Sequence, residues 1–167
     1  MTELEETTVH DSTTERVWRG EFESAFALSR RQEATSKPPN GLVVSSDEEV
    51  CRKLAKSLGQ CGLAAIFAST VVESRIALAG REVFVVLCNE CLADGTYEDI
   101  VEFVRRSHTR IPLVVVSRTG EWPEYIRSVD RGAFDYVAYP PIREELQRVI
   151  RNALVWNRQN REGVDVI

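Results

Sequence analysis

The sequence has no long hydrophobic run. Nowhere does it approach the roughly 18 consecutive apolar residues of a membrane-spanning helix. Its N-terminus is polar and acidic, whereas a secretory signal begins basic and continues apolar. These absences argue against a secreted or membrane-spanning protein, and they predict a cytoplasmic protein without a membrane partner.

A concentration of positive charge is also missing. The chain has 21 Lys and Arg against 26 Asp and Glu, a formal net charge of −5, and its basic residues are scattered. A nucleic-acid binder usually carries a basic patch or stripe. We therefore expect no nucleic acid among the partners.

Cysteine is too sparse for a disulfide scaffold. The four cysteines fall within apolar runs; they are Cys51, Cys61, Cys88 and Cys91. Thiols in such positions suit the core of a protein in a reducing compartment. We predict that all four are core residues.

The chain is long enough for one globular domain with a polar extension, because 43% of its 167 residues are hydrophobic. Residues 1–15 contain five Thr and four Glu, a composition that buries too little surface to offset the entropy of ordering. Farther along, Trp18, Phe22 and Phe26 recur at helical spacing. This stripe predicts a short amphipathic helix that buries against the domain or a second subunit. We divide the chain into an extension (1–40), a domain (41–156) and a tail (157–167).

Strand-like and helix-like segments alternate through the predicted domain. Apolar runs predict strands at 42–45, 63–68, 83–88, 113–117 and 134–138. Helical periodicity predicts helices at 48–60, 71–79, 97–104, 121–130 and 144–156. Because parallel crossovers are right-handed, these five β-α units predict an α/β fold of the flavodoxin-like type. We expect a doubly wound, five-stranded parallel sheet in the order 2-1-3-4-5 with five helices, and a site at the carboxyl ends of the strands.

Four segments of the domain follow one known pattern. They are Leu42–Asp47, Leu92–Gly95, Ile111–Ser117 and Gly132–Pro140. In their order and spacing these segments resemble the response-regulator receiver family, also called CheY-like, over about residues 41–154. The resemblance implies a signalling domain of bacterial two-component, or phosphorelay, systems.

The same resemblance marks a pocket. In the family, an acidic pair after the first strand and an aspartate ending the third strand bind Mg²⁺, and that aspartate accepts the phosphoryl group. The resemblance places Ser45 and Ser46 at the acidic pair and Asn89 at the acceptor. Ser117 matches the family's hydroxyl, and Tyr139 replaces its lysine. We therefore expect a degenerate phosphorylation pocket, that is, a pseudo-receiver, with no metal and no cofactor.

These departures from the family are consistent with one another. Clustered carboxylates need cations nearby, and a half-buried lysine needs the carboxylates, so losing one group favours losing the other. We interpret Asn89 as an amide that closes a hydrogen-bond network and Ser117 as a hydroxyl bonded to nearby backbone. Asp47 is interpreted as an acidic residue that stabilises a helix N-terminus.

Two aromatic residues fall on the family's output surface. Tyr136 matches the switch aromatic; either it is held in one rotamer or it is an ordinary strand residue. Trp122 begins the fourth helix, and we expect it near Tyr136 and Tyr139 on the face of helix 4, strand 5 and helix 5. This face is predicted to bind a histidine kinase, a downstream effector or a twin subunit.

The sequence thus predicts a stand-alone receiver, because the chain ends soon after the last predicted helix. We expect this receiver to act by phosphorylation-independent protein contact and not to be an enzyme. One alternative is a phosphorelay receiver with an unorthodox acceptor: Ser45, Ser46 or Asp94. Another is a redox or metal protein that uses the C-x-x-C pair Cys88 and Cys91. Against it, this pair ends a strand, whereas a redox pair normally opens a helix.

Overall fold

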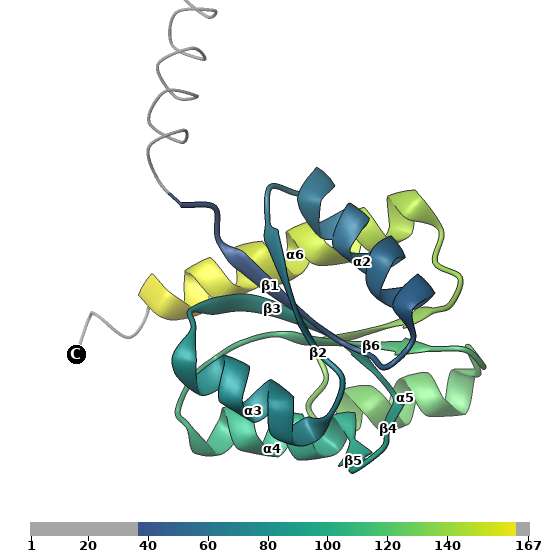
Figure 1. Ribbon diagram of the computed structural model, residues 1–167. Coiled ribbons are helices and arrows are strands. Elements are labelled where there is room, and N and C mark those ends of the chain that lie inside the picture. Colours follow the sequence, from purple (N-terminus) through teal and green to yellow (C-terminus); the bar gives the residue numbers. More distant parts are fainter. Residues whose placement is uncertain (1–36, 163–167) are drawn as a thin grey trace, which may run out of the picture. The chain divides into compact units, whose positions relative to one another are not determined.

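The computed structural model describes residues 37–162, whose central feature is a five-stranded parallel sheet (Figure 1). The order is β2-β1-β3-β6-β7, so the sheet is doubly wound and the predicted order 2-1-3-4-5 is confirmed. The strands are β1 (Asn40–Val44), β2 (Ala64–Ala68), β3 (Val83–Asn89), β6 (Leu113–Ser117) and β7 (Asp135–Ala138). The helix predicted around Trp18, Phe22 and Phe26 lies outside the described residues.

Five helices cover the two faces of the sheet. In Figure 1, α2 and α6 lie on one face, and α3, α4 and α5 lie on the other. Their bounds are α2 (Glu48–Gln60), α3 (Val71–Gly80), α4 (Tyr97–Arg106), α5 (Trp122–Asp130) and α6 (Arg143–Glu162). This arrangement confirms the flavodoxin-like α/β class. No helix within residues 37–162 is long and apolar enough to cross a membrane.

The central strand β3 is buried on both faces. Val85 and Leu87 belong to the core beneath α2 and α6, whereas Val86 and Cys88 belong to the core beneath α3 and α4. Burial on both faces produces the unbroken apolar run from which this strand is predicted. The polar residue Asn89 ends the strand, at the edge of the sheet where the site lies.

The last helix is longer than the sequence predicts. We expected a tail from residue 157, but α6 continues to Glu162. Tertiary contacts hold its final turns: the buried Asn157 donates from Nδ2 to the carbonyl of Arg110 at 3.2 Å, and the Arg161 guanidinium lies 4.2 Å from the centroid of the Phe84 ring. The sequence therefore ends this helix too early, at about Trp156, because neither contact leaves a periodic apolar pattern in the sequence.

A small hairpin follows β3. It consists of β4 (Cys91–Leu92) and β5 (Gly95–Thr96), which pair antiparallel. The sequence predicts only the turn between them. Asp94 in that turn accepts hydrogen bonds from the backbone N–H groups of Val71 and Val72, at 2.7 and 3.0 Å. The hairpin is thereby attached to the first turn of α3.

Candidate functional site

A small cavity opens at the carboxyl ends of β3 and β6, with a volume of about 180 Å³. Its lining comes from these strand ends, the loops that follow them, α2 and the residue after β7: Val50, Asn89, Glu90, Cys91, Val116, Ser117, Arg118, Thr119 and Tyr139. Three predicted pocket residues, Asn89, Ser117 and Tyr139, therefore meet in one place. The other two, Ser45 and Ser46, do not line this cavity: Ser45 is buried beside it, and Ser46 is exposed.

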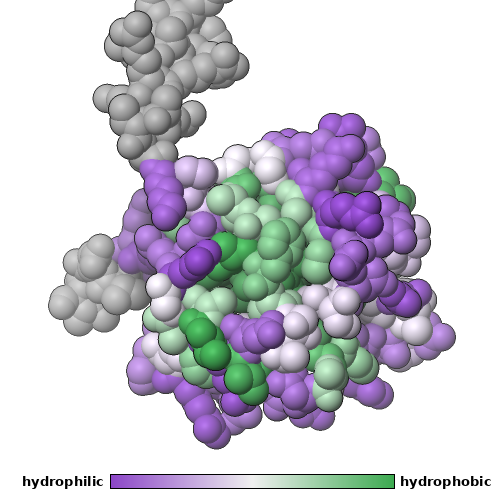
Figure 2. Space-filling view, in the orientation of Figure 1, coloured by the Kyte–Doolittle hydropathy of each residue, from purple (hydrophilic) through white to green (hydrophobic). Residues whose placement is uncertain are grey.

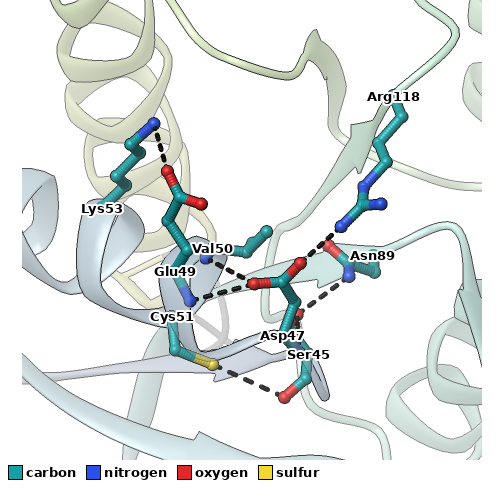
Figure 3. A network of polar contacts seen from close by, with 8 residues as sticks. All are labelled: Ser45, Asp47, Glu49, Val50, Cys51, Lys53, Asn89 and Arg118. Carbon is teal, nitrogen blue, oxygen red and sulfur yellow. Dashed lines mark hydrogen bonds and ion pairs between the residues drawn. The ribbon is translucent and has the colours of Figure 1, made fainter.

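Ser45 and Asn89 connect the ends of two neighbouring strands (Figure 3). The Asn89 Nδ2 donates to the Ser45 Oγ at 2.9 Å, and the backbone N–H of Asp47 donates to the same oxygen at 3.1 Å. Ser45 is buried. The hydroxyl of Ser45 thus accepts two hydrogen bonds. One of them comes from the amide of Asn89, in agreement with our interpretation of Asn89 as part of a hydrogen-bond network.

Asp47 caps the helix that follows. Its Oδ1 accepts from the backbone N–H groups of Glu49 and Val50, at 2.9 and 3.3 Å. Its other carboxylate oxygen forms an ion pair with Arg118 from the loop after β6 (Figure 3). The hydrogen bond from Val50 is the main reason why the pKa of Asp47 lies below its ordinary value. The predicted role at a helix N-terminus is confirmed.

Ser117 has a carboxylate partner that the sequence analysis missed. Its Oγ donates to the Oε2 of Glu90 at 2.8 Å, and it accepts the backbone N–H of Thr119 at 3.3 Å. The predicted backbone contact is therefore present but secondary. Glu90 directly follows Asn89 in the sequence. Its position just after a buried strand was the signal from which this residue of the site could have been predicted.

A second carboxylate extends these contacts to Tyr136. The Oε2 of Glu124 accepts from the Thr119 hydroxyl and, at 3.2 Å, from the Tyr136 hydroxyl. The hydroxyls of Thr119 and Ser117 lie 3.0 Å apart. Tyr136 is only 8% exposed. Continuous polar contacts thus run from the cavity to a buried tyrosine, a connection visible only in the folded chain.

Tyr139 lies on the opposite face of the sheet from Tyr136. Three positions separate the two residues, so they belong to different halves of the core. Our expectation that Tyr139 lies on the same face as Trp122 is therefore wrong. The Tyr139 hydroxyl is buried and has no hydrogen-bond partner among residues 37–162. The Lys53 ammonium lies 5.4 Å from the centroid of its ring and adds a cation beside the cavity.

Trp122 is the exposed end of an aromatic stack. Its side chain is 71% exposed, and its ring stacks on Tyr125 with centroids 5.3 Å apart. Tyr125 in turn meets Tyr136 edge to face, with centroids 6.1 Å apart. Tyr125 thus lies between Trp122 and Tyr136, and Tyr136 itself is buried.

Comparison with curated proteins finds relatives of this chain. No family model matches it. Among curated proteins it is 31% identical to the KDP operon transcriptional regulatory protein KdpE of Escherichia coli over 117 residues, which cover 69% of this chain and 51% of that protein. It is 26% identical to the response regulator protein PilR of Pseudomonas aeruginosa, with 68% of this chain and 25% of PilR covered. The photosynthetic apparatus regulatory protein RegA of Rhodovulum sulfidophilum is also 26% identical, with 68% and 62% covered. The chain therefore spans less than two thirds of the length of these relatives.

Solved receiver-type structures share the fold. NtrX of Brucella abortus, solved in complex with ATP, has a TM-score of 0.70 at 21% identity, with 78% of this chain and 30% of that one covered. The beryllofluoride-activated NtrC4 receiver domain dimer has a TM-score of 0.65 at 19% identity, with 71% and 98% covered. The described domain is a response-regulator receiver domain.

The turn after the third strand of this receiver domain has a structural role. Asp94 lies outside the cavity, and both of its carboxylate oxygens are engaged at the start of α3. The hydrogen bond from Val71 is the main cause that lowers the pKa of Asp94. Asp94 thus caps the N-terminus of α3 from a neighbouring loop.

The cysteines of the receiver domain differ in exposure. Cys88 is buried, and burial raises the pKa of its thiol. Cys51 and Cys61 are half-buried, whereas Cys91 is exposed, so the prediction of four core cysteines is wrong for Cys91. Cys88 points into the core from β3, while Cys91 begins the surface hairpin. Within residues 37–162, no group of three or more His, Cys, Asp or Glu side chains is arranged to hold a metal ion.

Proposed function

We propose that this receiver domain acts in two-component signalling by protein contact and without phosphorylation. The hydrogen bond from the Asn89 amide to Ser45 supports the proposal most directly. By resemblance to the family, both residues occupy positions of carboxylates. Here one provides an N–H donor and the other a hydroxyl that already accepts two hydrogen bonds.

The chemistry of the cavity disfavours a bound Mg²⁺. A hard cation prefers anionic oxygens, and it is repelled by the positive end of an N–H group. The carboxylate among the cavity-lining residues is that of Glu90, and it accepts the hydroxyl of Ser117. The nearby carboxylate of Asp47 is engaged with the start of α2 and with Arg118. A metal would have to displace several of these contacts to acquire its ligands.

The buried Tyr136 gives the proposal a structural consequence. Glu124 accepts hydrogen bonds from the hydroxyls of Tyr136 and Thr119. These bonds hold the Tyr136 ring in its buried rotamer, so the surface next to it keeps a single conformation. That surface carries apolar side chains of α5, namely Trp122, Ile126 and Val129. Exposed apolar groups of this kind are typical of a docking site for another protein. We propose a histidine kinase or a downstream effector as the partner, and we assign the domain no catalytic step.

The test is a titration of the protein with Mg²⁺ and beryllofluoride, a mimic of the phosphoryl group, followed by backbone NMR shifts. We expect no saturable change around Asn89, Ser117 or Tyr136. The positive control is the quadruple variant Ser45→Asp, Ser46→Asp, Asn89→Asp and Tyr139→Lys, which should respond because it restores every group that the family pattern requires. A saturable, Mg²⁺-dependent response of the unmodified protein would contradict the proposal.

A phosphorelay receiver with an unorthodox acceptor is the alternative. Its acceptors would be Ser45, Ser46 or Asp94, and Ser45 and Asp94 are engaged in hydrogen bonds. Glu90 in the cavity is the observation that favours this alternative, since it places one carboxylate beside Ser117. Mass mapping of phosphorylated residues after incubation with a histidine kinase distinguishes the two functions. A stoichiometric phosphoryl group on any of these residues would establish the alternative.

A further inference from the structure

The strand β2 forms one open edge of the sheet. It pairs only with β1, in the part of the chain that the structure describes. Ala64 donates its N–H to the carbonyl of Pro39, and the carbonyl of Ala68 accepts from Ser45, so even-numbered residues of β2 direct their backbone toward β1. Ala65 and Phe67 therefore point their N–H and C=O groups away from the sheet.

This edge is unusually apolar and has no charged residue. Its sequence is Ala-Ala-Ile-Phe-Ala, and the Phe67 side chain is 56% exposed. Proteins usually protect such edges with charges, proline, bulges or a covering element. Beside the edge, α3 exposes Val72 and Ile76, the latter to 68%. Figure 2 shows the resulting apolar patch in the middle of the face where β2 crosses the view of Figure 1.

The patch is hollowed. A groove of about 630 Å³ runs between β2 and α3, lined by Ala65, Ile66, Phe67, Glu73, Ile76, Ala77, Gly80 and Arg81. Its floor is apolar, and its two charged residues are Glu73, in the first turn of α3, and Arg81, which directly follows the helix. The Oε2 of Glu73 accepts hydrogen bonds from the backbone N–H and the hydroxyl of Ser69, at 2.7 and 2.8 Å. Neither Glu73 nor Arg81 forms an ion pair with another of residues 37–162.

We propose that a second copy of this chain pairs along this edge, with the two β2 strands antiparallel and related by a two-fold axis. With the axis at Ile66, Ala65 of each copy lies opposite Phe67 of the other. Because these two residues carry the outward-facing backbone groups, they form hydrogen-bonded pairs that exchange both N–H···O bonds, and the two Ile66 residues form the non-hydrogen-bonded pair between them. The result is a continuous sheet through both subunits.

Charge complementarity selects this occupant. Glu73 lies four residues before Ala77, in the first turn of α3, and Arg81 lies four residues after it, directly following the helix. A two-fold axis brings the two α3 helices side by side in opposite directions. Glu73 of each subunit then lies near Arg81 of the other, and both ion pairs form at once. A parallel arrangement would instead place like charges together, which is unfavourable.

The dimer is independent of the proposed function. The strand β2 lies at one edge of the sheet, and β7 lies at the opposite edge, with α5 packed near it (Figure 1). Pairing through β2 therefore leaves the surface around Trp122 free. If the phosphorylation-independent mechanism fails its test, this interface is unaffected, and the converse also holds.

The test measures the mass of the full chain by sedimentation over a wide range of concentrations. We expect a dimer for the unmodified protein. Arg81→Glu and Glu73→Arg each place like charges together twice in the dimer, so each should weaken association by roughly tenfold or more. A one-to-one mixture of the two variants should recover the dimer. One variant then carries a glutamate at both positions 73 and 81, the other carries an arginine at both, and each position 73 faces the opposite charge at position 81 of the partner. A merely damaged fold would not be rescued by mixing.

Phe67→Lys provides a second variant at an exposed position and should also give a monomer, whereas the Trp122→Ala control should remain dimeric. In the dimer, hydrogen exchange at the amides of Ala65 and Phe67 should be slow. Three outcomes would overturn the proposal: a monomer at all concentrations, a dimer that Trp122→Ala disrupts and Phe67→Lys does not, or a monomer that dimerises only after deletion of residues 1–36. The last outcome would identify the N-terminal extension as the occupant.

Discussion

The amide nitrogen of Asn89 lies 2.9 Å from the hydroxyl oxygen of Ser45, and this hydrogen bond joins the carboxyl ends of β3 and β1. The same oxygen accepts the backbone N–H of Asp47. One buried hydroxyl therefore satisfies a side-chain donor and a main-chain donor at the entrance to α2. The strand ends are held together by neutral groups at the edge where the family pattern has charged ones.

Replacement of Ser45 tests this arrangement. Ser45→Ala should lower the free energy of unfolding by about 1–3 kcal/mol, because it leaves two donors without an acceptor at a buried position. Urea denaturation measures the effect. The matched control is Ser46→Ala, an exposed neighbour that should change stability by less than about 0.5 kcal/mol. Equal effects of the two substitutions would show that the contact contributes nothing specific.

The contact between Glu124 and Tyr136 should be energetically coupled. In a double-mutant cycle of Glu124→Ala and Tyr136→Phe, we expect a coupling free energy of about 0.5–1.5 kcal/mol from the shared hydrogen bond. The control cycle replaces Glu121, an exposed residue at the start of the same helix, and it should be additive within about 0.5 kcal/mol. Additivity in both cycles would mean that Glu124 does not hold the ring in its buried position.

The surface around Trp122 is predicted to bind the signalling partner. Trp122→Ala should weaken binding of a partner recovered from the native cell by roughly 1–3 kcal/mol, since exposed aromatic side chains often dominate interfaces. Calorimetric titration measures the change, and circular dichroism checks the fold. Phe67→Ala is the control, because Phe67 is an exposed aromatic residue of β2, at the opposite edge of the sheet from β7 and α5. Unchanged affinity of the Trp122 variant would exclude this face.

Acid should remove a contribution that Asp94 makes to stability. Its pKa is lowered in the folded chain by hydrogen bonds from Val71 and Val72, so the folded state favours the ionised carboxylate. This contribution is complete above the ordinary Asp pKa of about 3.9 and is lost as the pH falls through the lower folded-state value. Asp94→Asn should therefore be less stable than the unmodified protein at neutral pH, and the difference should shrink in acid. A difference that stays constant down to pH 2 would contradict this explanation.

The two cysteines of the C-x-x-C sequence should react independently. At mildly alkaline pH, Cys91 should react quickly with a thiol reagent, while Cys88 should react only after unfolding, because burial raises the pKa of its thiol and blocks access. Stopped-flow titration with and without denaturant distinguishes the two thiols, and Cys91→Ser removes the fast phase. Fast reaction of both thiols, or a stoichiometric metal ion in the purified protein, would revive the redox or metal alternative.

Much of the fold could be predicted from local patterns. The unbroken apolar run of β3 indicates a strand buried on both faces, and the spacing of Val50, Leu54 and Leu58 indicates the buried side of α2. The alternation of such segments, with right-handed crossovers, leaves few topologies, and the observed sheet is the expected one. The positions of Asn89 and Ser117 at strand ends likewise follow from the sequence, since parallel strands bring their carboxyl ends to one edge.

What the sequence determined by itself is therefore the order of the elements, the sheet they form and the neutral character of Ser45, Ser46 and Asn89. Only the tertiary structure decided which side chains meet. The contact of Ser117 with Glu90 joins residues 27 positions apart, and that of Arg118 with Asp47 joins residues 71 apart. The separation of Tyr139 from Trp122 depends on the face to which each side chain points. Such contacts carry no periodic signal, because their energy comes from the distance between groups that the chain brings together only when it folds.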